Sequence, residues 1–139
     1  MDLAAIKHYR GVAQLVLRWY LEPISGILRL PGSCRSLFDV RVLQFQHDVD
    51  RVIDTALAPN EQAFLLLVYS DGMSPADAKT VTSVRMKRPA SALVALLRAA
   101  YPDDAMTSAC LTQLAIETKL GRALTKAGLD RVSDYFSRG

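Results

Sequence analysis

The stretch that decides the fold of this 139-residue chain is Tyr69-Ser70-Asp71-Gly72-Met73-Ser74-Pro75-Ala76-Asp77-Ala78. It predicts the end of one helix, a tight turn and the start of a second helix. Gly72 can take the left-handed conformation that closes a helix at low steric cost. Ser74 can cap the second helix, and Pro75 suits its first turn, where a missing N–H costs nothing. DNA-binding helix-turn-helix proteins and ordinary helical bundles both turn in this way, so the stretch alone leaves both interpretations open.

The charge changes sign directly after this stretch. Residues 58–78 contain three acids and no base, whereas residues 79–98 contain five bases and no acid. Arginine can contact guanine or phosphate with two hydrogen bonds, and lysine can serve the DNA backbone as a point charge. A solvated helix end would carry the same charges, so this alternative stays open. The candidate DNA-contacting residues of this segment are Lys79, Thr82, Ser83, Arg85, Lys87, Arg88 and Ser91.

Composition favours one folded domain without a membrane span. Half of the residues are hydrophobic and 22% are charged, which is typical of a globular core, and the net charge of +3 permits a nucleic-acid partner without requiring one. The two cysteines, Cys34 and Cys110, are far apart, as expected in a reducing cytoplasm. The start of the sequence lacks a signal-peptide pattern, and no apolar run is long enough to cross a membrane. We therefore expect a cytoplasmic protein that has no membrane partner.

Apolar residues recur at helical spacing along most of the chain and predict an all-α fold. The expected architecture is a compact bundle of six or seven helices that contains a helix-turn-helix-like corner. It forms a single domain, 1–139, with an N-terminal helix and loop (1–35), a helix-turn-helix-like core (38–101) and C-terminal helices (105–139). The expected helices cover about 3–21, 38–58, 60–69, 75–81, 89–101 and 106–127, followed by a short helix after Asp130.

Three local expectations can be checked against a structure. Pro31, Gly32 and Ser33 predict that the loop after the first helix continues to about residue 35. Asn60 is the expected cap of the helix that precedes the corner. The run 63–69 is apolar nearly all round, which predicts a central and largely buried helix.

The residues on both sides of the corner resemble a known family. The stretch Asn60-Glu61-Gln62-Ala63-Phe64-Leu65-Leu66-Leu67-Val68-Tyr69-Ser70-Asp71-Gly72-Met73-Ser74 resembles region 4 of sigma-70-type factors. There, a helix ending in Tyr precedes an acidic-Gly turn, an apolar residue and a Ser-capped helix. Small phage late-transcription regulators of the ArpU/RinA and antiterminator Q type look similar and have a similar length. The resemblance covers about Val49 to Tyr101.

This resemblance implies double-stranded DNA and RNA polymerase as partners. The segment between Thr82 and Arg98 would supply the helix that contacts bases. Pro89 falls inside that helix and would break it, so the contacting helix starts at Pro89 or the corner serves only as a structural hairpin. In the first case, helix N–H groups would point toward the basic residues before Pro89 and suit a phosphate.

Catalytic and cofactor motifs are absent from the sequence. It has no Gly-rich phosphate loop, no Gly-x-Ser-x-Gly and no zinc-ligand spacing. His47, Asp48 and Asp50 favour a solvated helix face over a metal site. We therefore expect a small DNA-binding transcription regulator that is not an enzyme and uses no cofactor. The alternative is a non-catalytic helical adaptor or assembly protein that acts through protein–protein contacts.

Overall fold

The computed structural model describes residues 3–21, 32–84, 108–132 and 135. Over these residues the chain forms five helices and no strand, so the expected all-α fold is confirmed. The expected six or seven helices slightly exceed these five, and the expected helix at 89–101 lies outside the described residues. The helices are α1 (Leu3–Leu21), α3 (Gly32–Ala56), α4 (Pro59–Tyr69), α5 (Pro75–Thr82) and α7 (Ser108–Lys126).

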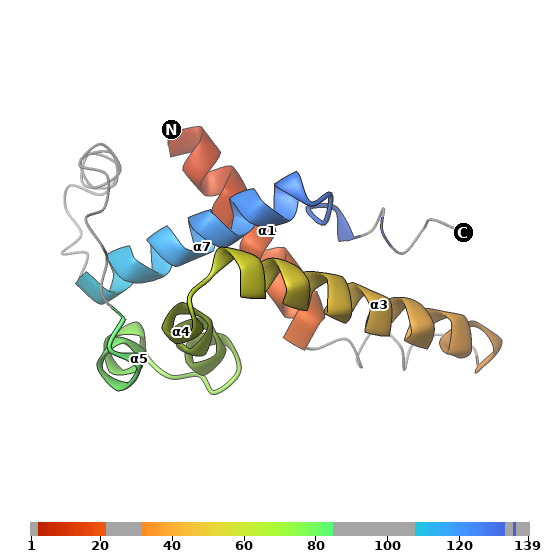
Figure 1. Ribbon diagram of the computed structural model, residues 1–139, viewed down its shortest axis with the longest axis horizontal. Helices are drawn as coiled ribbons and strands as arrows, with labels where there is room; N and C mark the ends of the chain where they lie inside the picture. The colour runs from red at the N-terminus through yellow and green to blue at the C-terminus, as the bar shows by residue number, and fades with distance from the viewer. Residues whose placement is uncertain (1–2, 22–31, 85–107, 133–134, 136–139) are drawn as a thin grey trace.

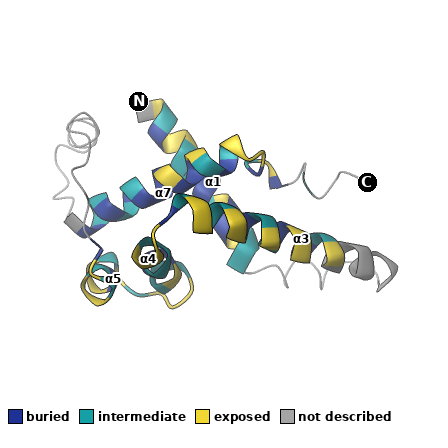
Figure 2. Cartoon of the chain, viewed as in Figure 1, coloured by how far each residue is buried: buried dark blue, intermediate teal, exposed yellow. Residues whose placement is uncertain are grey.

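Helix α7 is the element on which the other helices meet. It crosses α1 in the most extensive pair of the described helices, and it also packs against α3 and α5 (Figure 1). Helices α4 and α5 pair with each other at one end, while the N-terminal half of α3 extends away toward the opposite end (Figure 1). Buried residues lie on the inward faces around these crossings (Figure 2). The largest apolar side chains of this core are Phe45, Phe64, Leu120 and Leu124.

The crossing of α1 and α7 depends on the absence of one side chain. A Cβ atom added to Gly121 would lie 1.8 Å from the carbonyl oxygen of Tyr9. No real Cβ approaches backbone so closely, because van der Waals repulsion rises steeply below about 3 Å. The backbones of the two helices are therefore in direct contact at this point, and only glycine fits there.

The structure corrects the expectation that the run 63–69 forms a central, largely buried helix. In α4 only Phe64 and Leu65 are buried, and Leu66 is 47% exposed. The apolar run goes all round α4, but α4 packs mainly on α5 along one side, so only part of that run is covered. The central position belongs to α7, whose buried residues include Leu114, Leu120 and Leu124.

Two expected helix starts are also wrong. Helix α3 begins at Gly32, earlier than expected, because the first turn of a helix tolerates Gly and Ser, whose weak helix propensity matters more in the interior. Helix α4 has Ala58 rather than Asn60 at its N-cap, and Pro59 occupies the first helical position. Glu61 performs the capping, since its Oε1 accepts a hydrogen bond of 2.8 Å from the backbone N–H of Ala58.

Several large apolar side chains of the described residues point into solvent. Val40 and Leu43 on α3 are 63% and 66% exposed, and Val81 on α5 is 65% exposed. Isolated exposed apolar residues are common on globular proteins, whereas two on one helix face form a small apolar patch that favours contact with other proteins. None of the described helices combines the length and apolar character needed to cross a membrane.

Candidate nucleic-acid interface

The corner between α4 and α5 has the predicted backbone geometry. Gly72 has a φ of +66°, in the left-handed region that residues with a Cβ avoid. The N–H of Ser70 donates to the carbonyl of Leu66 at 2.8 Å, and the N–H of Met73 donates to the carbonyl of Leu67 at 3.0 Å. These bonds satisfy carbonyls that the end of α4 would otherwise leave open. The prediction for Gly72 is therefore confirmed.

The start of α5 is capped as the sequence predicted. Ser74 is the N-cap residue, and its Oγ accepts a hydrogen bond of 3.2 Å from the backbone N–H of Asp77. Pro75 follows as the first residue of the helix, where its missing N–H has no intrahelical partner to lose. The carboxylate of Asp77 in the first turn is favourable near the positive helix end. Both expectations, for Ser74 and for Pro75, are confirmed.

A second sharp change of direction follows at the end of α5. The helix extends through Thr80 and Thr82, whose hydroxyls donate to the carbonyls of Ala76 and Ala78 at 3.1 and 2.6 Å. These bonds hold the threonines in helical geometry despite their weak propensity, so the helix ends just after the expected end near Val81. Ser83 then adopts φ 55° and ψ 28°, a left-handed conformation that non-glycine residues seldom take.

Helix α5 is anchored through a small residue. Ala78 is completely buried, and α5 packs against both α4 and α7. Val84, directly after the Ser83 turn, is also buried. Helix α5 is therefore held to the core through Ala78, and Val84 packs into the same core directly after the Ser83 turn.

The structure describes three of the seven predicted DNA-contacting residues. Lys79, Thr82 and Ser83 all lie in or just after the last turn of α5. Ser83 is exposed, while Lys79 and Thr82 are half-buried, and the Thr82 hydroxyl donates its proton within the helix. The remaining four predicted residues lie outside the described residues, as does Pro89: Arg85, Lys87, Arg88 and Ser91.

A buried carboxylate connects the corner to the core, and the sequence interpretation missed it. Glu117 of α7 is completely buried. Its Oε2 accepts a hydrogen bond from Arg10 Nε at 2.9 Å, and its Oε1 accepts one from the hydroxyl of Tyr69 at 2.8 Å. Gln113 adds a third strong donor at 2.7 Å, and Gln14 lies at 3.5 Å from Oε2. A buried charge with this many donors is stabilised rather than orphaned.

The Glu117 junction joins three helices, since its partners come from α1, α4 and α7. Tyr69 is the last residue of α4, so the junction fixes the point at which the corner begins. Burial first, and then the negative charge of Glu117, raise the pKa of Tyr69 above its ordinary value. One signal in the sequence could have revealed the junction: Glu117 falls in the apolar stripe of α7, between Leu114 and Leu120.

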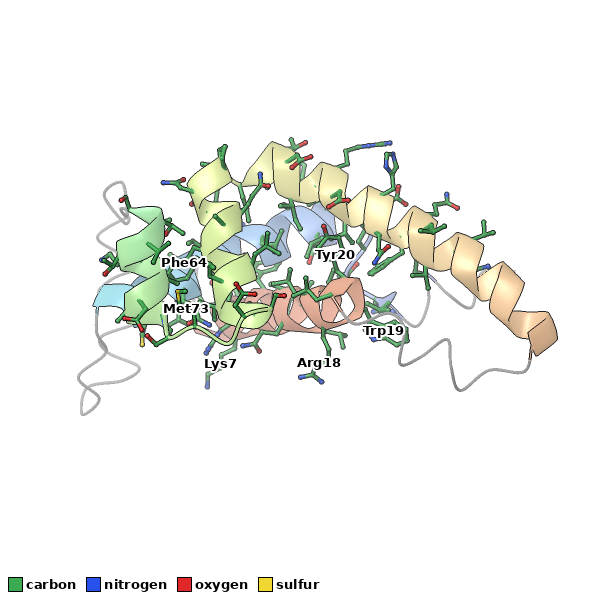
Figure 3. The ribbon with its side chains drawn as sticks, turned by 90° about the horizontal axis from the view of Figure 1, so that it is seen from below. Lys7, Arg18, Trp19, Tyr20, Phe64 and Met73 are labelled. Carbon is green, nitrogen blue, oxygen red and sulfur yellow. The ribbon has the colours of Figure 1, made fainter. Side chains whose placement is uncertain are left out.

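A basic face of α1 lies beside the α4 end of the corner. Lys7 and Arg18 are exposed and project from the same side of α1 (Figure 3). Their spacing of eleven residues corresponds to about three helical turns, which places them on one face. Arg18 also lines a hollow of about 320 Å³ together with Gln14, Leu21 and Tyr69. Arg18 of α1 is therefore close to Tyr69 at the end of α4.

The polar face of α3 carries contacts between side chains. The hydroxyl of Tyr135 donates to Asp48 Oδ2 at 2.9 Å, and the hydroxyl of Tyr20 donates to Asp50 Oδ1. The ring Nε2 of His47 lies 3.1 Å from Nη2 of Arg51. Among the described residues, no three His, Cys, Asp or Glu side chains are grouped so that they could hold a metal ion.

The arrangement at the corner places Lys79, Thr82 and Ser83 at the end of α5. It combines one capped turn at Gly72 and Ser74, a left-handed turn at Ser83 and a short anchored helix, with Arg18 of α1 beside the end of α4. Comparisons with protein-family models, with curated proteins and with solved structures found no match. The likeness to sigma-70 region 4 therefore depends on the residues of this chain alone.

Proposed function

We propose that this protein is a small DNA-binding transcription regulator of the sigma-like, phage type, which binds duplex DNA through the segment that follows α5 and acts with RNA polymerase. The observation that carries the proposal is the capped corner at Gly72 and Ser74, followed directly by the acid-free basic segment 79–98. A helix-turn-helix needs a first helix fixed to the core, a turn that follows it, and a second helix that reaches the DNA. Helix α5, which is anchored through the buried Ala78, and the left-handed turn at Ser83 support the first two of these requirements.

The chemistry of the proposed contact is mainly electrostatic. Arg85, Lys87 and Arg88 follow the Ser83 turn within five residues and would neutralise phosphates of the DNA backbone. Lys79 precedes the turn and adds a fourth cation, while Thr82, Ser83 and Ser91 offer neutral hydroxyl contacts. Three released counterions predict that affinity falls by about 40-fold between about 50 and 200 mM salt.

The test is fluorescence anisotropy with a labelled duplex of about 30 base pairs at both salt concentrations. The triple variant Arg85→Ala/Lys87→Ala/Arg88→Ala is expected to lose at least about tenfold in affinity and to flatten the salt dependence. A matched control removes the same charge from two positions on α3 and one position five residues beyond the end of α7: Arg41→Ala/Arg51→Ala/Arg131→Ala. Equal binding by wild type and the first triple variant, or no binding by wild type at low salt, would overturn the proposal.

A helical adaptor is the second candidate function, favoured by the exposed apolar pair on α3. Val40 and Leu43 are three residues apart, so they share a helix face, and both are more than 60% exposed. This function predicts a molar mass that rises with concentration in light scattering. The double variant Val40→Ser/Leu43→Ser should then remain monomeric, whereas the triple variant of the basic segment should associate like wild type.

A further inference from the structure

The outer side of α7 carries an open groove that the DNA-binding proposal does not use. The groove has a volume of about 620 Å³ and is bounded by Tyr9 of α1 and Ala56 at the C-terminal end of α3. Both helices lie beside α7 (Figure 1). Ala115 and Ala123 of α7 provide small apolar surfaces along it. The groove is therefore open and mostly apolar, with space above the alanines.

Three cations line the groove along α7, and no acid lines it. Lys119, Arg122 and Lys126 are separated by three and four residues, so they form one row about 10 Å long on one helix face. All three are exposed. Within the part of the chain that the structure describes, Lys119 is the only one of the three in an ion pair. Arg122 and Lys126 present positive charge to solvent.

The first cation of the row already holds a carboxylate from another helix. Lys119 Nζ donates to Oε1 of Glu61 at 3.2 Å, and Glu61 belongs to the first turn of α4. The same pattern, an acid on a helix that meets a cation of α7, can be repeated at Arg122 and Lys126. A second helix could place two carboxylates one turn apart against these two side chains.

We propose that this groove docks an acidic amphipathic helix of a protein partner. The apolar face of such a helix would cover Ala56, Ala115 and Ala123, and its acidic edge would pair with Arg122 and Lys126. The small side chains allow close approach of a helix, as in other helix-in-groove complexes. A nucleic-acid backbone would satisfy the cations but leave the alanines uncovered. A small ligand would remain largely exposed in so open a groove.

This site is independent of the proposed DNA contact. None of the residues that line the groove belongs to the corner or to the basic segment 79–98. Lys119, Arg122 and Lys126 come from the C-terminal region, where acids and bases balance in sequence. Within α7 these three cations outnumber its one acid, Glu117, which is completely buried, so the exposed face of α7 is positive.

The probe is a labelled helical peptide of about 20 residues with Glu at i, i+3 and i+7 beside a face of Leu and Ala. Wild-type protein is expected to bind it with a Kd below about 100 µM at about 50 mM salt, and more weakly at high salt. Arg122→Glu/Lys126→Glu should lose at least about tenfold. A peptide with Lys in place of Glu should bind this variant better than wild type, because the charges are exchanged.

Two control variants separate the groove from general electrostatics. Lys7→Glu/Arg18→Glu reverses the same charge on α1 and should leave peptide affinity within about twofold of wild type. Ala123→Leu keeps all three cations but narrows the groove, and should weaken binding by about fivefold or more. Binding unaffected by Arg122→Glu/Lys126→Glu, or no binding of the peptide, would overturn the proposal. The proposal would also be overturned if wild type bound a DNA duplex but not the peptide, and Arg122→Glu/Lys126→Glu abolished that duplex binding.

Discussion

Two regions that meet at the C-terminal end of α4 contrast in how they are held. The corner at Gly72 and Ser74 is built by backbone conformation and by hydrogen bonds between residues at most six apart in sequence. The Glu117 junction is built by side chains from three helices, and its bond to Arg10 joins residues 107 apart. The corner lies mostly in solvent, whereas the carboxylate of the junction is completely buried.

Because the corner is held by local contacts and the junction by long-range contacts, the two regions control different properties of the molecule. The shape of the corner is set locally, and each of its features stabilises the fold by only about 1 kcal/mol. Its position is set by Tyr69, the last residue of α4, whose hydroxyl donates to Glu117. Changes at the corner should therefore alter the turn and spare the fold. Changes at the junction should loosen the attachment of α4 and α1 to α7.

Gly121→Val is expected to have the largest effect. Any Cβ at this position collides with backbone of Tyr9, which cannot move away as a flexible side chain would. The two helices must separate, and we expect a loss of more than about 3 kcal/mol in the free energy of unfolding. Denaturant unfolding followed by circular dichroism measures it. Gly11→Val is the matched control, because a Cβ at Gly11 meets nothing within 4 Å. Equal stability of the two variants would show that the helices do not touch there.

Glu117→Gln should cost about 2 kcal/mol. The amide keeps the size of the side chain but removes the charge that strengthens the bonds from Arg10 and Tyr69. Its NH2 group would also lie against hydrogen-bond donors, with which it forms no hydrogen bond. Urea unfolding measures the loss. Glu61→Gln provides the comparison, because Glu61 pairs with Lys119 at the surface and its replacement should cost below about 1 kcal/mol. If Glu61→Gln were the more damaging change, the contrast between junction and surface would fail.

Alkaline pH should weaken the junction before it weakens the corner. The pKa of Tyr69 is raised in the folded protein above the ordinary 10.0, and the pKa values of Tyr20 and Tyr135 are raised to about 12. The stability from these neutral hydroxyls is fully present below pH 10 and is lost as pH rises through the folded-state values. Stability measured against pH should fall above pH 10, and less steeply in Tyr69→Phe. If stability fell equally steeply with pH in wild type and Tyr69→Phe, ionisation of Tyr69 would not contribute to the loss of stability.

Gly72→Ala should destabilise the protein by about 1 kcal/mol. The methyl group meets nothing within 4 Å, so the whole cost comes from the left-handed backbone at φ +66°. Thermal unfolding measures the change, and the alanine variant should keep the wild-type circular dichroism spectrum. A loss comparable to that of Gly121→Val would mean that the corner is not set locally.

Ser83→Gly should have the smallest effect and the opposite sign. Ser83 adopts φ 55°, a conformation that strains a residue with a Cβ, so glycine relieves this strain. The greater conformational freedom of glycine in the unfolded chain offsets only part of that gain. We expect a gain of up to about 0.5 kcal/mol, measured in the same thermal experiment. A clear loss would show that the serine hydroxyl holds the turn in place.

The parts of the fold that follow from neighbouring residues were predictable. The Gly72 turn, the Ser74 cap, Pro75 at the start of α5 and the all-α class all depend on contacts within a few residues. The burial of α4 was not predictable, because a run that is apolar all round does not say which side finds a partner. The early start of α3 at Gly32 was missed because weak helix propensity at a first turn is easily overridden.

The candidate interface was predictable only as a segment. The charge pattern selected residues 79–98. The structure adds that Lys79 and Thr82 lie in the last turn of α5 and that Ser83, directly after it, has a left-handed backbone. Neither the Glu117 junction nor the groove on α7 appeared in the sequence interpretation. Both depend on which face of α7 points inward, and helical periodicity alone does not identify the neighbours of a face.

The sequence by itself determined where helices end and begin around the corner, because capping and left-handed turns involve residues that are already adjacent in the chain. Tertiary structure decided which carboxylate became buried and which cations stayed in solvent. Glu117 and Lys119 are two residues apart on α7, yet one is completely buried among donors from α1 and α4 and the other is exposed. The physical reason is that the environment of a charge depends on which helix packs against it, and helix packing joins residues far apart in sequence.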